Sequence, residues 1–103
     1  MKTLGTHNYY VYMLTNKNRT VLYTGFTKDL SNRLYWHRNP DTLGRPHFTL
    51  RYRCFYLVYY EHFDDVDQAI AREKQIKGYS RKKKDLLMEG FNPEWKFLNE
   101  DIV

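Results

Sequence analysis

Five positions in the sequence combine residue types and spacings that suit chemistry on phosphates. Two short tyrosine-bearing tripeptides, YVY at residues 10–12 and YTG at residues 23–25, come first. Arg33 and His37 follow, four residues apart, and Glu73 comes much later. A guanidinium group can stabilise charge that develops on phosphoryl oxygens, and a carboxylate can hold a divalent cation. The set therefore contains groups that could bind a phosphate and a divalent cation.

Arg33 and His37 fall on one side of an expected helix. Asp29 is placed to cap a helix over residues 30–38, and at about 100° per residue Arg33 and His37 share its inward stripe with two leucines. A charged arginine directed at a sheet is unusual unless an anion lies there, and a scissile phosphate would be such an anion. The alternatives are that Arg33 extends to the rim of the sheet or pairs with Glu73.

Glu73 interrupts the apolar stripe of a second expected helix, which contains Val66, Ala69, Ile70, Glu73 and Ile76. A carboxylate among apolar residues is costly unless it is paired or binds a cation. Mg²⁺ fits this position, because it commonly takes one or two carboxylates and keeps several waters. A salt bridge from Glu73 to Arg33 or Arg72 is the alternative, and the two states can alternate with metal binding.

The two tripeptides lie in an expected hairpin. Residues 9–15 and 20–24 are rich in aromatic and β-branched types and predict two strands joined by a four-residue turn. Such a loop would place Tyr12 directly opposite Tyr23, and opposed residues on antiparallel strands project from the same face. A slip of one residue would separate them. Gly25 is expected to allow a sharp exit from the second strand.

Tyr12 and Tyr23 are candidates for handling the attacking water. A phenol has an unperturbed pKa of ~10, so it is a poor base near neutral pH unless its anion is stabilised. A nearby cation and Arg33 would lower that pKa. The alternative, in a chain with 10 tyrosines, is a core aromatic residue whose hydroxyl group is hydrogen-bonded.

The remaining segments complete an α+β fold with a three-stranded antiparallel sheet flanked by helices, in the order β-β-α-β-α-α. We expect one domain over residues 1–103 with its core at about 9–98. The further elements expected are a loop at 40–50, a buried strand at 54–60, a helix from Asp65 or Asp67 to Lys77 before Gly78, a helix from Ser80 through Met88, and a tail at 91–95 that packs its aromatic residues onto the body.

This order and spacing resemble the GIY-YIG nuclease superfamily over residues 9 to 98, most closely its small stand-alone bacterial members. The resemblance implies a phosphodiesterase site that uses Mg²⁺ or Mn²⁺, with Glu73 as the metal ligand. Tyr23 matches the usual general base and Tyr12 the tyrosine that supports the site. His37 lies where members carry His or Tyr, and Arg33 would hold the phosphate.

The chain also departs from the family pattern. Tyr10 and Val11 replace Gly and Ile of the first tripeptide, and Thr24 replaces Ile of the second. Phe26 stands where the repair nuclease of this superfamily has Lys, which puts phosphate binding in doubt. Asn92 is a possible match to the late asparagine of many members, or else caps a turn.

The charge of the chain favours a polyanionic partner. The formal net charge is +5, and a basic flank follows the second helix, formed by Lys74, Lys77, Arg81, Lys82, Lys83 and Lys84. These residues could neutralise phosphates without reading bases. We expect nucleic acid as the partner, with DNA favoured over RNA. The protein is expected to be a monomer or weak dimer. DNA repair or processing is the role expected for it. The rival function is a non-catalytic nucleic-acid-binding module that keeps the nuclease fold.

Composition excludes several other classes of site. Cys54 is the only cysteine, so the chain has no internal disulfide or cysteine-based zinc site. No apolar run approaches the ~20 residues of a membrane span, and residues 1–8 lack the apolar part of a signal peptide, so a cytoplasmic location is expected. His7, His47 and His62 fit no pattern of a site and are interpreted as surface or loop residues.

Overall fold

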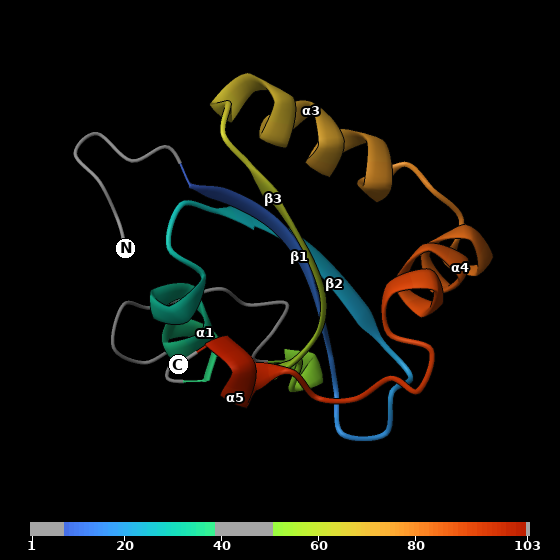
Figure 1. The fold of residues 1–103 in the computed structure, drawn as a ribbon. Coiled ribbons are helices and arrows are strands. Elements are labelled where there is room, and N and C mark those ends of the chain that lie inside the picture. Colours follow the sequence, from blue (N-terminus) through green and yellow to red (C-terminus); the bar gives the residue numbers. More distant parts are fainter. Residues whose placement is uncertain (1–7, 39–50, 103) are drawn as a thin grey trace.

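A computed structural model describes residues 8–38 and 51–102, and the loop expected at 40–50 lies outside them. Three strands form one antiparallel sheet in the order β2-β1-β3 (Figure 1). The α+β fold with a three-stranded antiparallel sheet is confirmed. The elements are β1 (Tyr9–Thr15), β2 (Leu22–Thr27), α1 (Leu30–Arg38), β3 (Tyr56–Phe63), α3 (Val66–Lys77), α4 (Arg81–Phe91) and α5 (Asn99–Ile102).

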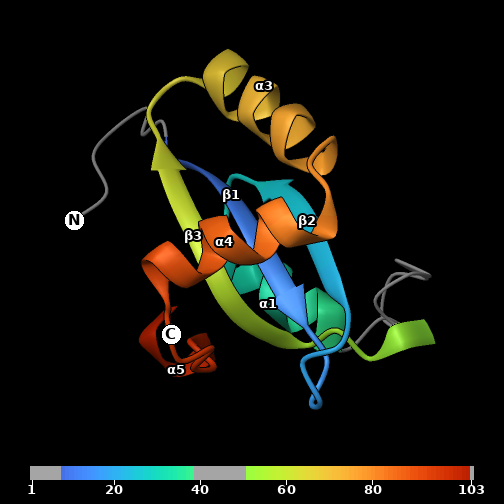
Figure 2. The same ribbon diagram turned by 90° about the vertical axis from the view of Figure 1, so that its right-hand side faces the viewer.

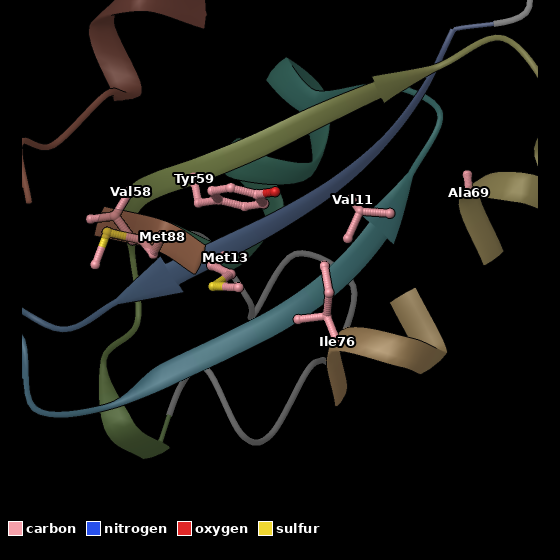
Figure 3. Close-up of a cluster of buried hydrophobic side chains, with 7 residues drawn as sticks. All are labelled: Val11, Met13, Val58, Tyr59, Ala69, Ile76 and Met88. Carbon is pink, nitrogen blue, oxygen red and sulfur yellow. The ribbon is translucent and has the colours of Figure 1, made fainter. Parts of the chain in front are cut away.

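Helices cover both faces of the sheet. Figures 1 and 2 show α3 and α4 on one side and α1 with α5 on the other. Alternate residues of β1 supply the two cores, because successive side chains of a strand point to opposite faces. Figure 3 shows the core beneath α3 and α4, formed by Val11, Met13, Val58, Tyr59, Ala69, Ile76 and Met88. The core on the α1 side contains Tyr12, Leu14, Leu30, Cys54 and Leu57.

The hairpin register differs from the predicted one by two residues. Thr15 pairs with Leu22, because the loop has six residues rather than four. The Asn16 side chain holds this longer loop, since its Oδ1 accepts hydrogen bonds from the backbone N–H of Thr20 at 2.7 Å and of Val21 at 3.1 Å. A shift of two residues leaves every side chain on its expected face. The prediction that Tyr12 lies directly opposite Tyr23 was wrong, but the prediction that the two share a face was right.

Gly25, rather than Tyr23, is the partner of Tyr12 across the strands. The ring of Tyr12 lies against this glycine, because a Cβ placed on Gly25 would stand 2.5 Å from both Cζ and Oη of Tyr12. The two tyrosine rings are diagonal neighbours with centroids 6.4 Å apart. Gly25 therefore lies inside β2 and makes room for a ring, which corrects the expectation that it forms a sharp exit from the strand.

Three predicted helix starts are confirmed by their caps. Asp29 accepts a hydrogen bond from the N–H of Asn32 at 3.1 Å, Asp65 from Gln68 at 2.9 Å and Ser80 from Lys83 at 3.2 Å. Each cap satisfies one of the N–H groups that a helix leaves unpaired in its first turn. Three predicted elements have other bounds: β2 spans 22–27 rather than 20–24, β3 spans 56–63 rather than 54–60, and α4 continues to Phe91 instead of ending at Met88.

The segment after α4 runs beside β3 and bonds to its backbone. Asn92 is buried, and its Nδ2 donates to the carbonyl oxygens of Val58 at 2.9 Å and Lys96 at 2.8 Å. Leu98 donates its N–H to Leu57 O at 2.7 Å. The Asn99 side chain adds two bonds, one from Leu57 N and one to Phe55 O, each 2.9 Å long. The Asn92 amide thus fastens the tail to the sheet.

The tail also packs its aromatic residues back, as predicted. The Phe91 ring meets the rings of Tyr59 and Tyr60 edge-on, with centroids 5.2 and 5.3 Å apart. Trp95 packs against the core beneath α3 and α4. In residues 8–38 and 51–102, none of the helices has the length and apolar character needed to span a bilayer.

Substitution Gly25→Ala is expected to lower the free energy of unfolding by roughly 1–3 kcal/mol, because the new methyl group overlaps the buried ring of Tyr12. Urea denaturation measures this change. Gly90→Ala is the matched control, since nothing lies within 4 Å of a Cβ at that helical position. Equal stability of the two variants would contradict the close packing of Tyr12 on Gly25.

Candidate active site

The phenol of Tyr12 lies at the centre of the predicted site. Tyr12 is fully buried, and Arg33 of α1 donates a hydrogen bond to its hydroxyl. Burial raises the pKa of Tyr12 far above its ordinary value, with Tyr23 and Glu73 acting in the same direction and Arg33 opposing them. The Tyr12 hydroxyl is therefore neutral at physiological pH and acts by hydrogen bonding rather than as a base.

Arg33 reaches from α1 to the second strand. Its Nη1 donates to the carbonyl oxygen of Phe26 at 3.4 Å, and the residue is half-buried. Contacts with both Tyr12 and Phe26 set the direction of the guanidinium group. Tyr23, also half-buried, lies beside Tyr12 on the same face.

Glu73 approaches from the other layer of the fold. It belongs to α3, whose buried residues pack against the opposite face of the sheet, yet its charge acts on the Tyr12 phenol. Charge interactions weaken with distance, and the effect of Glu73 on the pKa of Tyr12 is the smallest of those that act on it. The Glu73 side chain is 18% exposed, and its Oε2 forms an ion pair with Lys77 Nζ at 2.9 Å.

Glu73 has the donor chemistry for a divalent cation. The described residues contain no group of three or more His, Cys, Asp or Glu side chains able to hold a metal ion. A cation at Glu73 would thus resemble the Mg²⁺ sites that use one carboxylate and complete their shell with water and substrate phosphate. The Lys77 ammonium group is paired with the Glu73 carboxylate, but the Lys77 side chain is 52% exposed and can turn into solvent.

The last predicted catalytic residue, His37, belongs to α1 one turn after Arg33. Its side chain lies outside the described part of the structure.

A second ion pair beneath α3 was not anticipated from the sequence. Arg72 binds Glu61 through Nη2 at 2.9 Å and Nε at 3.1 Å, and the Tyr59 hydroxyl donates to the same carboxylate. The hydrogen bond that Arg72 donates to Glu61 raises the pKa of Arg72. The network fixes the side of α3 adjacent to Glu73. Pattern alone could not find it, because Glu61 lies on β3 and the pairing is a contact between elements.

Several cations of the predicted basic flank contact other groups, although all of them except Lys84 are exposed. Arg81 pairs with Asp85 at 2.8 Å and donates to the carbonyl of Thr20 at 2.9 Å, which ties α4 to the hairpin loop. Lys83 Nζ lies 4.2 Å from the centre of the Tyr79 ring. Lys77 is engaged by Glu73 and Lys84 is half-buried, whereas Lys74 and Lys82 are exposed.

Comparison with known proteins identifies the family. The sequence profile of the GIY-YIG catalytic domain matches residues 8–85. The chain belongs to the GIY-YIG family. It therefore carries a nuclease-type domain, as the order of its tripeptides, arginine, histidine and glutamate predicted.

Relatives of this GIY-YIG domain occur in bacteria and archaea. A UPF0213 protein of Staphylococcus saprophyticus is 40% identical over 83 residues, covering 80% of this chain and 96% of the relative. One from Haloquadratum walsbyi is 35% identical over 81 residues, covering 79% and 86%. The NMR structure of a UPF0213 protein from Bacillus halodurans superimposes with a TM-score of 0.56 at 29% identity, covering 90% of this chain and 95% of that one.

The raised pKa of Tyr12 predicts a loss of stability in alkali. The unfolded chain releases the phenolic proton near pH ~10 while the folded chain keeps it. The unfolded state then binds fewer protons, and stability falls above that pH by up to roughly 1.4 kcal/mol per pH unit. Urea unfolding of the parent and of Tyr12→Phe at several pH values between 8 and 11 measures the difference. Parallel pH slopes for the two proteins would show that Tyr12 is not held neutral.

Proposed function

We propose that this chain is a metal-dependent, endonuclease-like phosphodiesterase that cleaves nucleic acid, with DNA rather than RNA as its substrate. The observation that carries the proposal is the interaction of the Tyr12 phenol with Tyr23, Arg33 and Glu73. Tyr23, Arg33 and Glu73 come from three separate elements, β2, α1 and α3. Two tyrosines, a guanidinium group and a carboxylate are the groups that phosphodiester hydrolysis needs to activate water, stabilise charge and bind a cation.

The tyrosines take different parts in this proposal. Tyr23, which is half-buried, is the general base that receives a proton from the attacking water. Tyr12 remains neutral, and its hydroxyl orients Arg33 by accepting its hydrogen bond. Arg33 stabilises the negative charge that develops on the phosphoryl oxygens. His37 shares the positioning of water or substrate.

Glu73 holds the metal ion, Mg²⁺ or Mn²⁺, after Lys77 has turned away from the carboxylate. When bound, such an ion supplies Lewis-acid stabilisation of the phosphate. The half-buried position of Glu73 makes this carboxylate costly to leave unpaired, and its ion pair with Lys77 at 2.9 Å offsets that cost.

The exposed lysines Lys74 and Lys82 contact the phosphates of the bound strand. Such contacts position a substrate without reading its sequence. We propose a monomer or weak dimer that acts in DNA repair or processing in the cytoplasm.

A second candidate function is a non-catalytic module that binds nucleic acid through the same fold. Two observations favour it: Lys77 already neutralises Glu73 at 2.9 Å, and Phe26 supplies no cation where the repair nuclease of this superfamily carries Lys. Metal-dependent cleavage separates the two functions.

Cleavage assays on single-site variants test the catalytic roles. Glu73→Gln is expected to abolish Mg²⁺-dependent cleavage of a DNA panel, since the shape is kept and the charge is lost. Arg33→Ala is expected to lower the rate by about 10²-fold or more. Tyr23→Phe should remove most cleavage while the affinity for Mg²⁺, measured by calorimetry, stays near that of the parent.

Thermal melting of each variant beside the parent controls for folding. If folded Glu73→Gln cleaves as fast as the parent, Glu73 has no part in catalysis. If the parent binds DNA but never cleaves it in Mg²⁺ or Mn²⁺, the non-catalytic module is the better description.

Lys74→Ala and Lys82→Ala should each weaken DNA binding to a similar degree for all sequences. Each is expected to reduce the slope of log affinity against log salt by roughly one unit, because each removes one phosphate contact. Fluorescence anisotropy over a salt series provides the measurement. Lys96→Ala removes the same charge from a side chain that faces Glu94 and serves as the control. An unchanged salt slope in both variants would remove these lysines from the binding face.

A further inference from the structure

A recess at the end of the hairpin combines aromatic rings with positive charge. Its volume is about 280 Å³, and it is lined by the loop residues 16–18 together with Tyr52, Arg53, Phe55 and Tyr56. In Figures 1 and 2 the hairpin loop and the segment that begins at residue 51 lie side by side at the same end of the sheet. We call this feature the hairpin recess. It lies apart from the residues of the proposed catalytic site.

The aromatic wall of the hairpin recess is held in place from behind. The Tyr56 ring stacks on Phe97 with centroids 4.3 Å apart and an interplanar angle of 19°. The Arg19 guanidinium group lies 4.2 Å from the centre of the Phe97 ring, and its Nε donates to the carbonyl of Trp95 at 3.1 Å. A ring fixed in this way needs little ordering when a ligand binds, so less conformational entropy is lost.

The turn before β3 brings further side chains into the recess. Cys54 is buried, while its neighbours Arg53 and Phe55 line the recess. Arg53 adopts a left-handed backbone with φ of 56°, and its carbonyl accepts from Phe55 N at 3.1 Å. Such a conformation is unfavourable for a residue other than glycine and persists only where the surroundings impose it. Tyr52 remains 41% exposed.

Charge separates the hairpin recess from the other large hollow of the described residues. Lys17 and Arg53 are the charged residues of its lining, and Arg51 adds a guanidinium group 5.6 Å from the Tyr52 ring. The hollow of about 350 Å³ near the start of α1 is instead lined by one lysine and by two aspartates, Asp29 and Asp101. Of these two hollows, the hairpin recess is the one with the charge that a polyanion requires.

We propose that the hairpin recess binds an unpaired nucleobase of the nucleic acid, stacked on the tyrosine rings, with Lys17 and Arg53 on the adjoining phosphates. Alternating rings and cations are the means by which proteins bind single strands, since every base has a face that can stack. A base within a duplex is already stacked and paired, and cannot enter. The volume suits one small planar group, at the lower end of ligand pockets.

This proposal rests on the proposed function and narrows its substrate. Tyr12 of the catalytic site and Thr15 at the hairpin end of β1 are three residues apart, a separation of ~10 Å. Stacked nucleotides of one strand rise by ~3.4 Å each, so about three nucleotides cover that distance. The substrate then carries an unpaired stretch a few nucleotides from the phosphate that is cleaved.

Fluorescence anisotropy in the presence of a chelator tests the recess without cleavage. Three probes of equal length carry the same label: a single-stranded thymidine oligonucleotide, an abasic strand with the same phosphates, and a blunt duplex. The single strand is expected to bind most tightly. Tyr52→Leu should weaken its binding by roughly tenfold and leave the abasic strand unaffected, whereas Tyr52→Phe should bind like the parent because the ring is kept.

Two controls match the variants in chemistry but lie outside the recess. Tyr35→Leu removes an exposed tyrosine from α1 and should bind the single strand like the parent. Lys17→Ala should weaken binding of all three probes, and more so than Lys96→Ala. The inference is overturned if the abasic strand or the duplex binds as tightly as the single strand, or if Tyr52→Leu and Tyr35→Leu bind alike.

The result is distinguishable from failure of the catalytic proposal. Preferential binding of the single strand through Tyr52, without any Mg²⁺-dependent cleavage, supports the recess and rejects the nuclease. Cleavage that does not depend on Tyr52 or on unpaired bases rejects the recess alone. Absence of binding to all three probes rejects both.

Discussion

The contact between the Tyr12 ring and the bare backbone of Gly25 is the constraint around which the site is organised. Any side chain at residue 25 would occupy the space of that ring. The ring can therefore cross from the central strand over β2, and its hydroxyl meets the guanidinium group that comes from α1. The last tyrosine of the first tripeptide and the glycine of the second thus make one packing unit. This unit explains why the glycine is needed at a position where the backbone itself is an ordinary strand.

Two carboxylates near α3, those of Glu61 and Glu73, form ion pairs of different kinds. Glu61 is bound by Arg72 and by the Tyr59 hydroxyl beneath α3, an arrangement in which losing one partner would strand a half-buried charge. Glu73, one residue along α3 from Arg72, forms its ion pair with Lys77, whose side chain is flexible and half-exposed. A rigid pair thus anchors the helix, and an exchangeable pair leaves the neighbouring carboxylate open to another cation.

Local patterns predicted much of the fold because local chemistry determines it. The helix starts at Asp29, Asp65 and Ser80 follow from side-chain oxygens next to apolar periodic segments, and the two tyrosines were placed on their shared face. The register failed because the loop length depends on Asn16, whose side chain binds backbone groups four and five residues away. The alternation of residue types that predicts a strand does not reveal such a hydrogen bond.

Contacts between distant segments were beyond the same reasoning. The Arg72 pair with Glu61 and the bond from Arg81 to the hairpin loop engage two cations in contacts with other elements, although the sequence shows only a basic run. The hairpin recess likewise joins residues about 35 positions apart and could be seen only once the chain was folded. The site residues themselves were found through the family order, since a lone tyrosine or arginine has no distinguishing pattern.

The segment that follows α4 covers part of one edge of the sheet, the outer edge of β3. An outer strand normally offers a row of open N–H and C=O groups to which a strand of another molecule can add. On β3 these groups at residues 57 and 58 are already taken by Asn92, Leu98 and Asn99. Strand addition from a second molecule is therefore blocked there by three residues of the same chain. The side-chain amides of Asn92 and Asn99 therefore oppose fibril-like extension of the sheet at these residues.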